Sequence, residues 1–201
     1  FKDTVIIHSM TDTKYNYVNH NILREKYKIS GSKIIGYIAA LTFEKDHYTF
    51  LNTAKKLLQS IPDLHFVIIG DGILRANLEK YSIENGLQNH VSFLGFIDNP
   101  KKVIPEIDLL LFTSTKEGLG STILDFFVAK KPVVSVKNGG SEDLIQHGIN
   151  GFICEEKDID CLSKYALRIL SDANVRTNIV KNAFEFVENN FSIEIVTTKT
   201  Y

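Results

Sequence analysis

The chain has 201 residues, of which 44% are hydrophobic, and a formal net charge of −1. This is enough for one domain with a complete core, and the near-zero charge provides no general basic field for nucleic acid or acidic lipid. No apolar run is long enough to span a bilayer, and the charged, polar start of the chain does not resemble a signal peptide.

The chain contains two cysteines, Cys154 and Cys161. The pair fits neither the disulfide framework of a small secreted domain nor the ligand spacing of a zinc site. The six histidines are scattered and form no i, i+4 pair. We therefore expect the cysteines to be structural and the protein to work in a reducing cytosol.

The first 30 residues are expected to form a linker. Residues 5–8 are a short, strand-like start, and a short helix is predicted over 21–27 in the polar stretch after them. The domain itself is predicted to span 31–201.

Residues 31–95 alternate strands with helices. Each strand is an almost wholly apolar run, and the helices are recognised by apolar residues at helical spacing or by a terminating Pro or Gly. The predicted order is a strand over 33–41, a helix over 48–60, a strand over 64–69, a helix that follows 70–72 and reaches 85–86, and a strand over 91–94.

The alternation continues to the end of the chain. The predicted order is a short helix over 100–104, a strand over 107–112, a glycine turn over 117–120, a helix from 121, a strand over 132–136, a turn at 139–140, a short helix over 142–146, a strand over 151–154 and amphipathic helices over 158–170 and 173–189. Residues 193–201 are a candidate for one more helix.

Strands that are apolar throughout and alternate with helices indicate a parallel sheet covered on both faces. The predicted fold class is therefore α/β, a doubly wound, Rossmann-like parallel sheet. Ligands on such sheets bind beyond the carboxyl ends of the strands, near the point where the strand order reverses. The loops that follow the strands should line one crevice.

The stretch over 113–131 has the clearest chemical signal. Its glycine turn leads into a helix expected to begin near Ser121, whose hydroxyl can cap free backbone N–H groups. Unpaired amides and the positive end of a helix form an anion site, and the acids Glu117 and Asp125 would flank the anion. The plain alternative is two surface carboxylates beside a helix start. The candidates here are Glu117, Gly118, Leu119, Gly120, Ser121, Thr122 and Asp125.

Other loops add further candidates. Lys45 follows the first apolar strand, where a mobile full charge could meet an anion, although a solvated surface lysine is the plain alternative. Phe96 and Ile97 follow the third strand, and a glycine pair at 139–140 follows the fifth. We expect His47 to be structural.

The spacing of Glu117 and Asp125 resembles the E-x7-E signature of the family 4 (group 1) glycosyltransferases, with Asp in place of the second Glu. All five loops resemble, in order and spacing, the C-terminal domain of this family's GT-B fold, as do residues 62–72, 91–95 and 148–152. The resemblance covers nearly the whole chain. It implies a donor-binding domain preceded by an interdomain linker over 1–30, with the N-terminal acceptor domain absent from this chain.

The resemblance also implies residue roles in a retaining transfer from a nucleoside diphosphate sugar. Glu117 would contact the hydroxyls of the donor sugar, Lys45 the diphosphate, and Asp125 the ribose, while Phe96 and Ile97 would border the base. Further donor-binding candidates are Gly118, Leu119, Gly120, Ser121, Thr122, Gly139 and Gly140.

By the same resemblance, the whole enzyme would be a hexosyltransferase of bacterial cell-surface polysaccharide or lipopolysaccharide synthesis. Its partners would be the nucleotide-sugar donor and a glycan or lipid-linked acceptor held by the missing domain, without nucleic acid, cofactor or metal. We expect it in the cytoplasm, with peripheral association at the inner face of the membrane. The isolated chain is expected to be inactive.

Three positions depart from the family pattern. Ala40 stands where the family often has Arg, Asp143 where Glu is common, and Asp125 is one methylene shorter than Glu. Two alternatives stay open: a nucleotide-sugar epimerase of the same fold, and a non-catalytic nucleotide-sugar-binding module. A nicotinamide dehydrogenase is disfavoured because no G-x-G-x-x-G follows the first strand.

Overall fold

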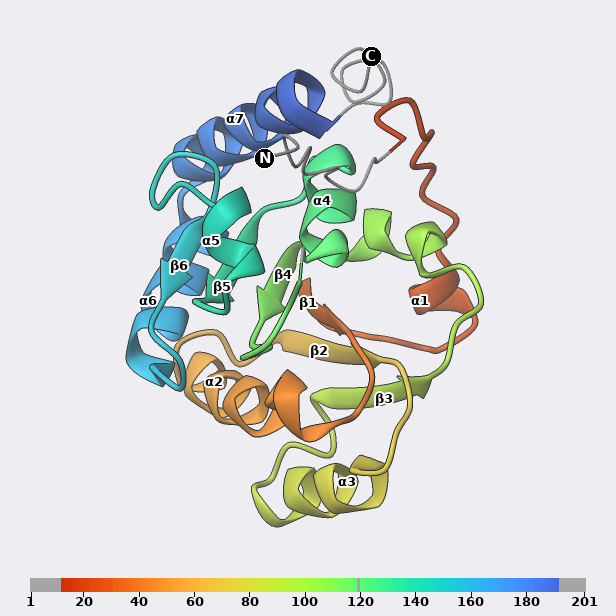
Figure 1. The fold of residues 1–201 in the computed structure, drawn as a ribbon. Coiled ribbons are helices and arrows are strands. Elements are labelled where there is room, and N and C mark those ends of the chain that lie inside the picture. Colours follow the sequence, from red (N-terminus) through yellow and green to blue (C-terminus); the bar gives the residue numbers. More distant parts are fainter. Residues whose placement is uncertain (1–11, 119, 192–201) are drawn as a thin grey trace, which may run out of the picture.

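The computed structural model describes residues 12–118 and 120–191 (Figure 1). Six strands in this part of the chain form one parallel sheet in the order β3-β2-β1-β4-β5-β6. This order confirms the predicted doubly wound, Rossmann-like fold. The strands are β1 (Lys33–Ile38), β2 (Leu64–Ile69), β3 (Val91–Gly95), β4 (Leu109–Phe112), β5 (Val133–Val136) and β6 (Phe152–Cys154).

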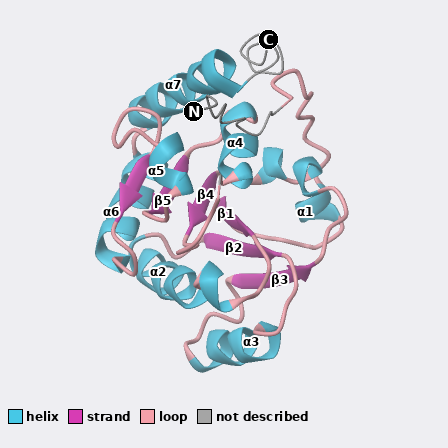
Figure 2. Cartoon of the chain, in the orientation of Figure 1, coloured by secondary structure: helices cyan, strands magenta, loops and turns pink. Residues whose placement is uncertain are grey.

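The helices cover both faces of the sheet (Figure 2). The strand order runs in opposite directions from β1 and from β4, so right-handed crossovers place α2 and α3 on one face and α4 and α5 on the other. α6 packs against α2, and α7 packs against α4 and α6. The helices are α1 (Ile22–Glu25), α2 (His47–Ser60), α3 (Arg75–Glu84), α4 (Ser121–Val128), α5 (Gly140–Leu144), α6 (Ile159–Ser171) and α7 (Ala173–Phe191), and the 3-10 turns are η1 (Phe43–Lys45), η2 (Pro100–Lys102) and η3 (Ile104–Glu106).

The core lies between the sheet and the two helix layers. Every residue of β2 is buried, which explains why this strand is apolar except for His65. The buried Tyr37 ring of β1 lies 5.7 Å from the Phe50 ring of α2 and 5.6 Å from the Phe112 ring of β4. This packing provides a rigid base for the loops that follow β1 and β4.

The short helix predicted over 100–104 is present as two separate 3-10 turns, η2 and η3, rather than as one continuous helix. Pro105 has no N–H to donate to the Lys101 carbonyl, which prevents one α-helix from running through both turns, whereas Pro100 is at the first helical position, where proline is tolerated. The predicted strand over 5–8 and helix over 193–201 lie outside the described residues. Within 12–118 and 120–191, no helix is both long and apolar enough to cross a bilayer.

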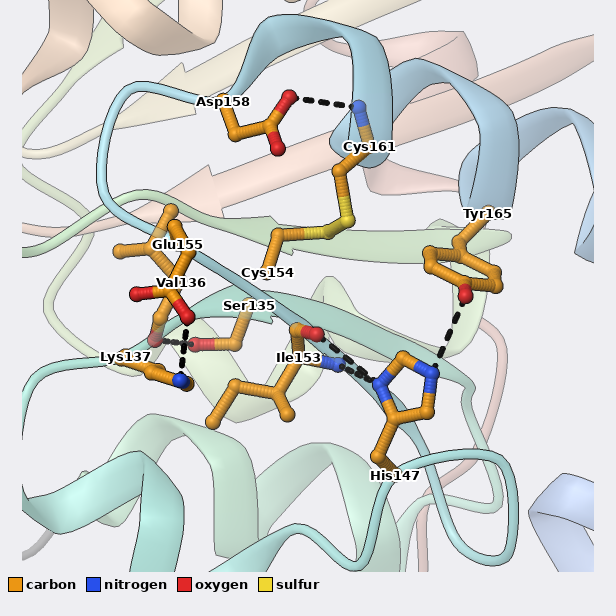
Figure 3. Close-up of a disulfide and its surroundings, with 10 residues drawn as sticks. All are labelled: Ser135, Val136, Lys137, His147, Ile153, Cys154, Glu155, Asp158, Cys161 and Tyr165. Carbon is orange, nitrogen blue, oxygen red and sulfur yellow. Dashed lines mark hydrogen bonds and ion pairs between the residues drawn. A yellow bond between two sulfur atoms is a disulfide. The ribbon is translucent and has the colours of Figure 1, made fainter.

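The expectation that the cysteines form no disulfide was also wrong. Cys154, the last residue of β6, is bonded to Cys161 in the first turn of α6, with the Cα atoms 5.9 Å apart (Figure 3). The chain turns back within four residues, and the Asp158 carboxylate caps α6 by accepting a hydrogen bond from the Cys161 amide at 2.9 Å. The turn geometry brings the two sulfurs together, which a count of cysteines does not reveal. The cysteines therefore give no support for a reducing compartment.

Candidate functional site

Two charged side chains meet at the point where the strand order reverses. Lys45 ends η1, directly after β1, and Glu117 lies in the loop after β4. The Lys45 Nζ atom lies 2.5 Å from the Glu117 Oε1 atom, and the two side chains are only 18% and 19% exposed. Their partial burial strengthens the ion pair relative to one in open water. The structure thus brings together the two residues predicted to be catalytic.

The loop after β5 joins this pair. Glu117 forms a parallel bridge with Gly139. The Asn138 side chain fixes the arrangement, because its Nδ2 atom donates to the Ser114 carbonyl at 2.7 Å and its Oδ1 atom accepts from the Ser141 amide at 2.8 Å. The predicted pair of glycines therefore lies beside Glu117, with Gly140 beginning α5.

The loop that carries Glu117 leads into the N-terminus of α4. The helix begins at Ser121 as predicted, but Gly120 is the N-cap residue and no side chain caps the helix. The φ angle of Gly120 is +66°, a left-handed conformation that glycine adopts without strain. The amides of Ser121 and Thr122, in the first turn of α4, have no backbone acceptor in the described part of the chain, so they can receive an anion. Leu119 lies outside the described residues.

A separate apolar hollow lies beyond β1, β2 and β3. It encloses about 280 Å³ and its walls include both predicted base-contacting residues. Phe96 is 77% exposed, so its ring is available to a ligand. The hollow is lined by Ile38, Ala39, Ala40, Ile69, Gly70, Asp71, Phe96, Ile97, Asp98 and Pro100. Its volume and apolar walls suit a ring system such as a nucleobase.

Asp125 is not free in this structure. Its Oδ1 atom lies 2.8 Å from the Nζ atom of Lys101, a residue of η2. Burial raises the pKa of the Asp125 carboxyl, and the Lys101 charge opposes this effect. The Tyr17 hydroxyl is buried without a hydrogen-bond partner in the described structure, and its pKa is raised by burial and by the Asp125 charge.

Lys101 was missed at the sequence level. It follows Pro100, which lines the apolar hollow, and its ammonium lies 5.5 Å from the centre of the Tyr15 ring. The one available signal was its position in the loop after β3, because the loops after all the strands face the same crevice.

His47 follows the Lys45 loop but has a different environment. It is 1% exposed and its ring lies 4.8 Å from that of Tyr37. Burial lowers the pKa of His47 to about 4, so the imidazole is neutral at physiological pH. A neutral, buried ring suits packing rather than contact with a ligand.

The model of the family described as "Glycosyl transferases group 1" matches residues 19–186. The chain belongs to this family. It is 28% identical over 171 residues to a 2-deoxystreptamine N-acetyl-D-glucosaminyltransferase of Niallia circulans, covering 82% of this chain and 44% of that protein. It is 27% identical to the lipopolysaccharide core biosynthesis glycosyltransferase LpsE of Rhizobium meliloti, covering 73% of this chain and 43% of LpsE.

Solved structures agree with this assignment. The fold matches Anabaena Alr3699/HepE, crystallised with UDP and glucose, with a TM-score of 0.87 and 23% identity over 96% of this chain and 54% of that one. It also matches the C-terminal domain of the group 1 glycosyltransferase LpcC from Francisella tularensis, with a TM-score of 0.80 and 26% identity over 91% of this chain and 99% of that domain. The chain therefore spans about half the length of the whole proteins it matches and corresponds to a C-terminal GT-B domain.

Proposed function

We propose that this chain is the donor-binding half of a retaining glycosyltransferase that uses a nucleoside diphosphate sugar. The observation that carries the proposal is the Lys45–Glu117 ion pair, 2.5 Å long, beside the N-terminus of α4 at the reversal of strand order. A cation and free helix amides suit the diphosphate of such a donor, and the carboxylate beside them suits the hydroxyls of its sugar.

Transfer leaves negative charge on the departing diphosphate, and the site must stabilise that charge. Lys45 supplies a full positive charge, and the amides of Ser121 and Thr122 add hydrogen-bond donors fixed by the helix. When the donor binds, the Lys45 ammonium exchanges Glu117 for a phosphate oxygen. The Glu117 carboxylate is then free to accept hydrogen bonds from the sugar hydroxyls.

The nucleoside would occupy the apolar hollow beside Phe96 and Ile97. Asp125 would accept hydrogen bonds from the two ribose hydroxyls, a contact that competes with its ion pair to Lys101. The hollow and the Lys45–Glu117 pair belong to loops at the same edge of the sheet, so one extended ligand can reach both.

The acceptor half would cover this same edge. Three large apolar side chains there are strongly exposed: Phe43 at 72%, Ile73 at 77% and Phe96 at 77%. They follow β1, β2 and β3 respectively. Exposed apolar side chains gathered at one edge are typical of a surface that another domain or a ligand covers. We infer that the whole enzyme binds a glycan or lipid-linked acceptor opposite them, in the cytoplasm at the inner membrane face, for cell-surface polysaccharide or lipopolysaccharide synthesis.

The proposal is tested by calorimetry on this chain with UDP, GDP and ADP, together with a radiolabelled transfer assay on the chain and on the full-length protein. We expect one nucleotide to bind with a dissociation constant in the micromolar to millimolar range, roughly −4 to −8 kcal/mol. We expect transfer by the full-length protein only, because catalysis needs donor and acceptor held together.

Absence of binding to all three nucleotides would overturn the donor-binding role. Turnover by this chain alone would overturn the two-domain proposal. Hydrolysis or epimerisation of the donor without an acceptor, by the full-length protein, would instead favour an epimerase. Donor binding without any chemistry by the full-length protein would favour a non-catalytic module. The specific argument for such a module is Ala40, which lines the hollow at a position where the family often has Arg.

A further inference from the structure

Three successive carbonyl groups of the Lys45 loop are held by hydroxyl groups from outside the loop. The Tyr37 hydroxyl donates to the Lys45 carbonyl at 2.8 Å, and the Thr113 Oγ1 atom lies 3.1 Å from the Lys45 carbonyl and 3.0 Å from that of Asp46. The Ser114 Oγ atom lies 3.3 Å from the Glu44 carbonyl and 3.2 Å from the Lys116 carbonyl, so its one proton is shared between them. We refer to the hydroxyls of Tyr37, Thr113 and Ser114 as the hydroxyl clamp.

The clamp comes from the rigid part of the molecule. Tyr37, Thr113 and Ser114 are each 0% exposed. Tyr37 lies in β1, and the other two follow β4 directly. Their hydroxyls are therefore fixed relative to the sheet, whereas the loop that they hold is a short 3-10 turn.

The loop needs such support. Asp46 has a φ angle of +43°, a left-handed conformation that residues other than glycine rarely adopt. Strained backbone of this kind persists only when surrounding groups over-determine it. The Asp46 side chain also caps α2, accepting from the Thr49 amide at 3.2 Å and from the Thr49 hydroxyl at 2.7 Å. The clamp and the cap together set the direction in which Lys45 leaves the loop.

The clamp also links the two halves of the ion pair. Thr113 and Ser114 belong to the loop that carries Glu117, and the Thr115 amide of the same loop donates to the Glu44 carbonyl at 2.8 Å. Hydrogen bonds to backbone carbonyls thus join the loop after β1 to the loop after β4. The Lys45 and Glu117 side chains of the same two loops form the ion pair. A shift of one loop therefore shifts the backbone from which the charge of the other loop extends.

Most buried hydroxyls in folded proteins have a hydrogen-bond partner, so these bonds alone would be compatible with a purely structural role. What singles them out is their target, because two of the three hydroxyls bond the carbonyl of Lys45 itself. We propose that Tyr37 and Thr113 are positioning residues, which hold the Lys45 ammonium where a donor diphosphate binds. This rests on the proposed function, since it requires Lys45 to contact that diphosphate.

The first test is a double-mutant cycle on this chain with UDP and uridine as calorimetric probes. Thr113→Val removes the hydroxyl and keeps the branched shape. We expect it to weaken UDP binding at least fivefold, to change uridine binding less than twofold, and to have no further effect on UDP in a Lys45→Ala background. Thr113→Ser keeps the hydroxyl and should restore UDP affinity. Tyr37→Phe should behave like Thr113→Val.

Equal losses for UDP and uridine, or the same loss in the Lys45→Ala background, would overturn the positioning role. Ile169→Val is the control for general destabilisation, because Ile169 is fully buried in α6, away from the clamp. It should lower the melting temperature while UDP affinity stays at the wild-type value.

The second test needs no ligand. Amide hydrogen exchange at Lys45 and Asp46 should accelerate at least tenfold in Thr113→Val, and should stay near the wild-type rate in Thr113→Ser and Ile169→Val. Unchanged exchange in Thr113→Val would overturn the clamp even if UDP binds. If wild-type protein binds no nucleotide, the proposed function and the positioning role both fail, while the exchange result still decides whether the hydroxyls hold the loop.

Discussion

Asp125 and Lys101 form a pair that donor binding would have to rearrange. Their charged atoms are 2.8 Å apart, and both side chains are partly buried. A charge-assisted bond of this kind contributes on the order of 1.5–3 kcal/mol. A ribose that bonds Asp125 must therefore either share the carboxylate with Lys101 or displace the lysine.

Asp125→Asn tests the ribose contact. The amide keeps the size of the side chain but loses the negative charge and one acceptor. We expect the dissociation constant for UDP to rise about tenfold, the loss of one charge-assisted bond, and pyrophosphate affinity to change little. Calorimetry with both ligands provides the comparison. Asp63→Asn is the matched control, since Asp63 is exposed before β2, at the opposite edge of the sheet. Equal losses for UDP and pyrophosphate would show that Asp125 acts on the phosphate end instead.

At the scale of secondary-structure elements, the Cys154–Cys161 disulfide stabilises the fold by linking β6 to α6. The disulfide joins residues seven positions apart, and β6 contacts α6 as well. The ion pair of Lys137 with Glu155 lies near the same turn (Figure 3). Closing so short a loop in the unfolded chain costs little entropy, so the effect on stability is moderate.

Reduction of the disulfide should lower the free energy of unfolding by about 2 kcal/mol, from the loop-closure entropy of a short loop. Urea unfolding with and without a phosphine reductant measures this difference. The double variant Cys154→Ser, Cys161→Ser should have the free energy of unfolding of the reduced protein, and the reductant should not change it. Superimposable curves for the oxidised and reduced wild type would contradict the expected contribution.

Strands were more predictable than loops for a physical reason. A strand covered on both faces is nearly continuous in apolar residues, as β2 is apart from His65, so its sequence reveals it directly. The single helix predicted over 100–104 is divided into η2 and η3 because Pro105 removes a helical hydrogen bond without changing the apolar pattern. The N-cap of α4 is Gly120 rather than Ser121, because a left-handed turn precedes the helix and favours glycine.

Across the whole molecule, topology accounts for how much of the site was foreseeable. Lys45 and Glu117 are 72 positions apart in the chain yet form an ion pair, as expected because the carboxyl ends of parallel strands meet at one edge. Lys101 and the hydroxyl clamp were not foreseeable in this way. Their partners depend on the path of each loop and on side-chain rotamers, which neither apolar pattern nor motif spacing specifies.

At the scale of the whole molecule, the features of the candidate site gather at the carboxyl ends of the strands. Three loops bring together the Lys45–Glu117 pair and Gly139, neighbouring loops form the apolar hollow, and exposed Phe43 and Ile73 lie beyond the same strand ends. The chain corresponds to about half the length of the whole proteins it matches. The proposed donor site, which would need a second domain for transfer, accounts for both facts.

The most direct test of this account is the calorimetric titration of wild type, Lys45→Ala and Lys80→Ala with UDP, GDP and ADP. Lys80→Ala is matched in charge, because Lys80 is 75% exposed on α3 and pairs only weakly with Glu84 at 3.7 Å. The account predicts that wild type and Lys80→Ala bind the same nucleotide equally, while Lys45→Ala binds it about tenfold to a hundredfold more weakly. Equal affinity of Lys45→Ala and wild type, or no binding by wild type, would contradict it.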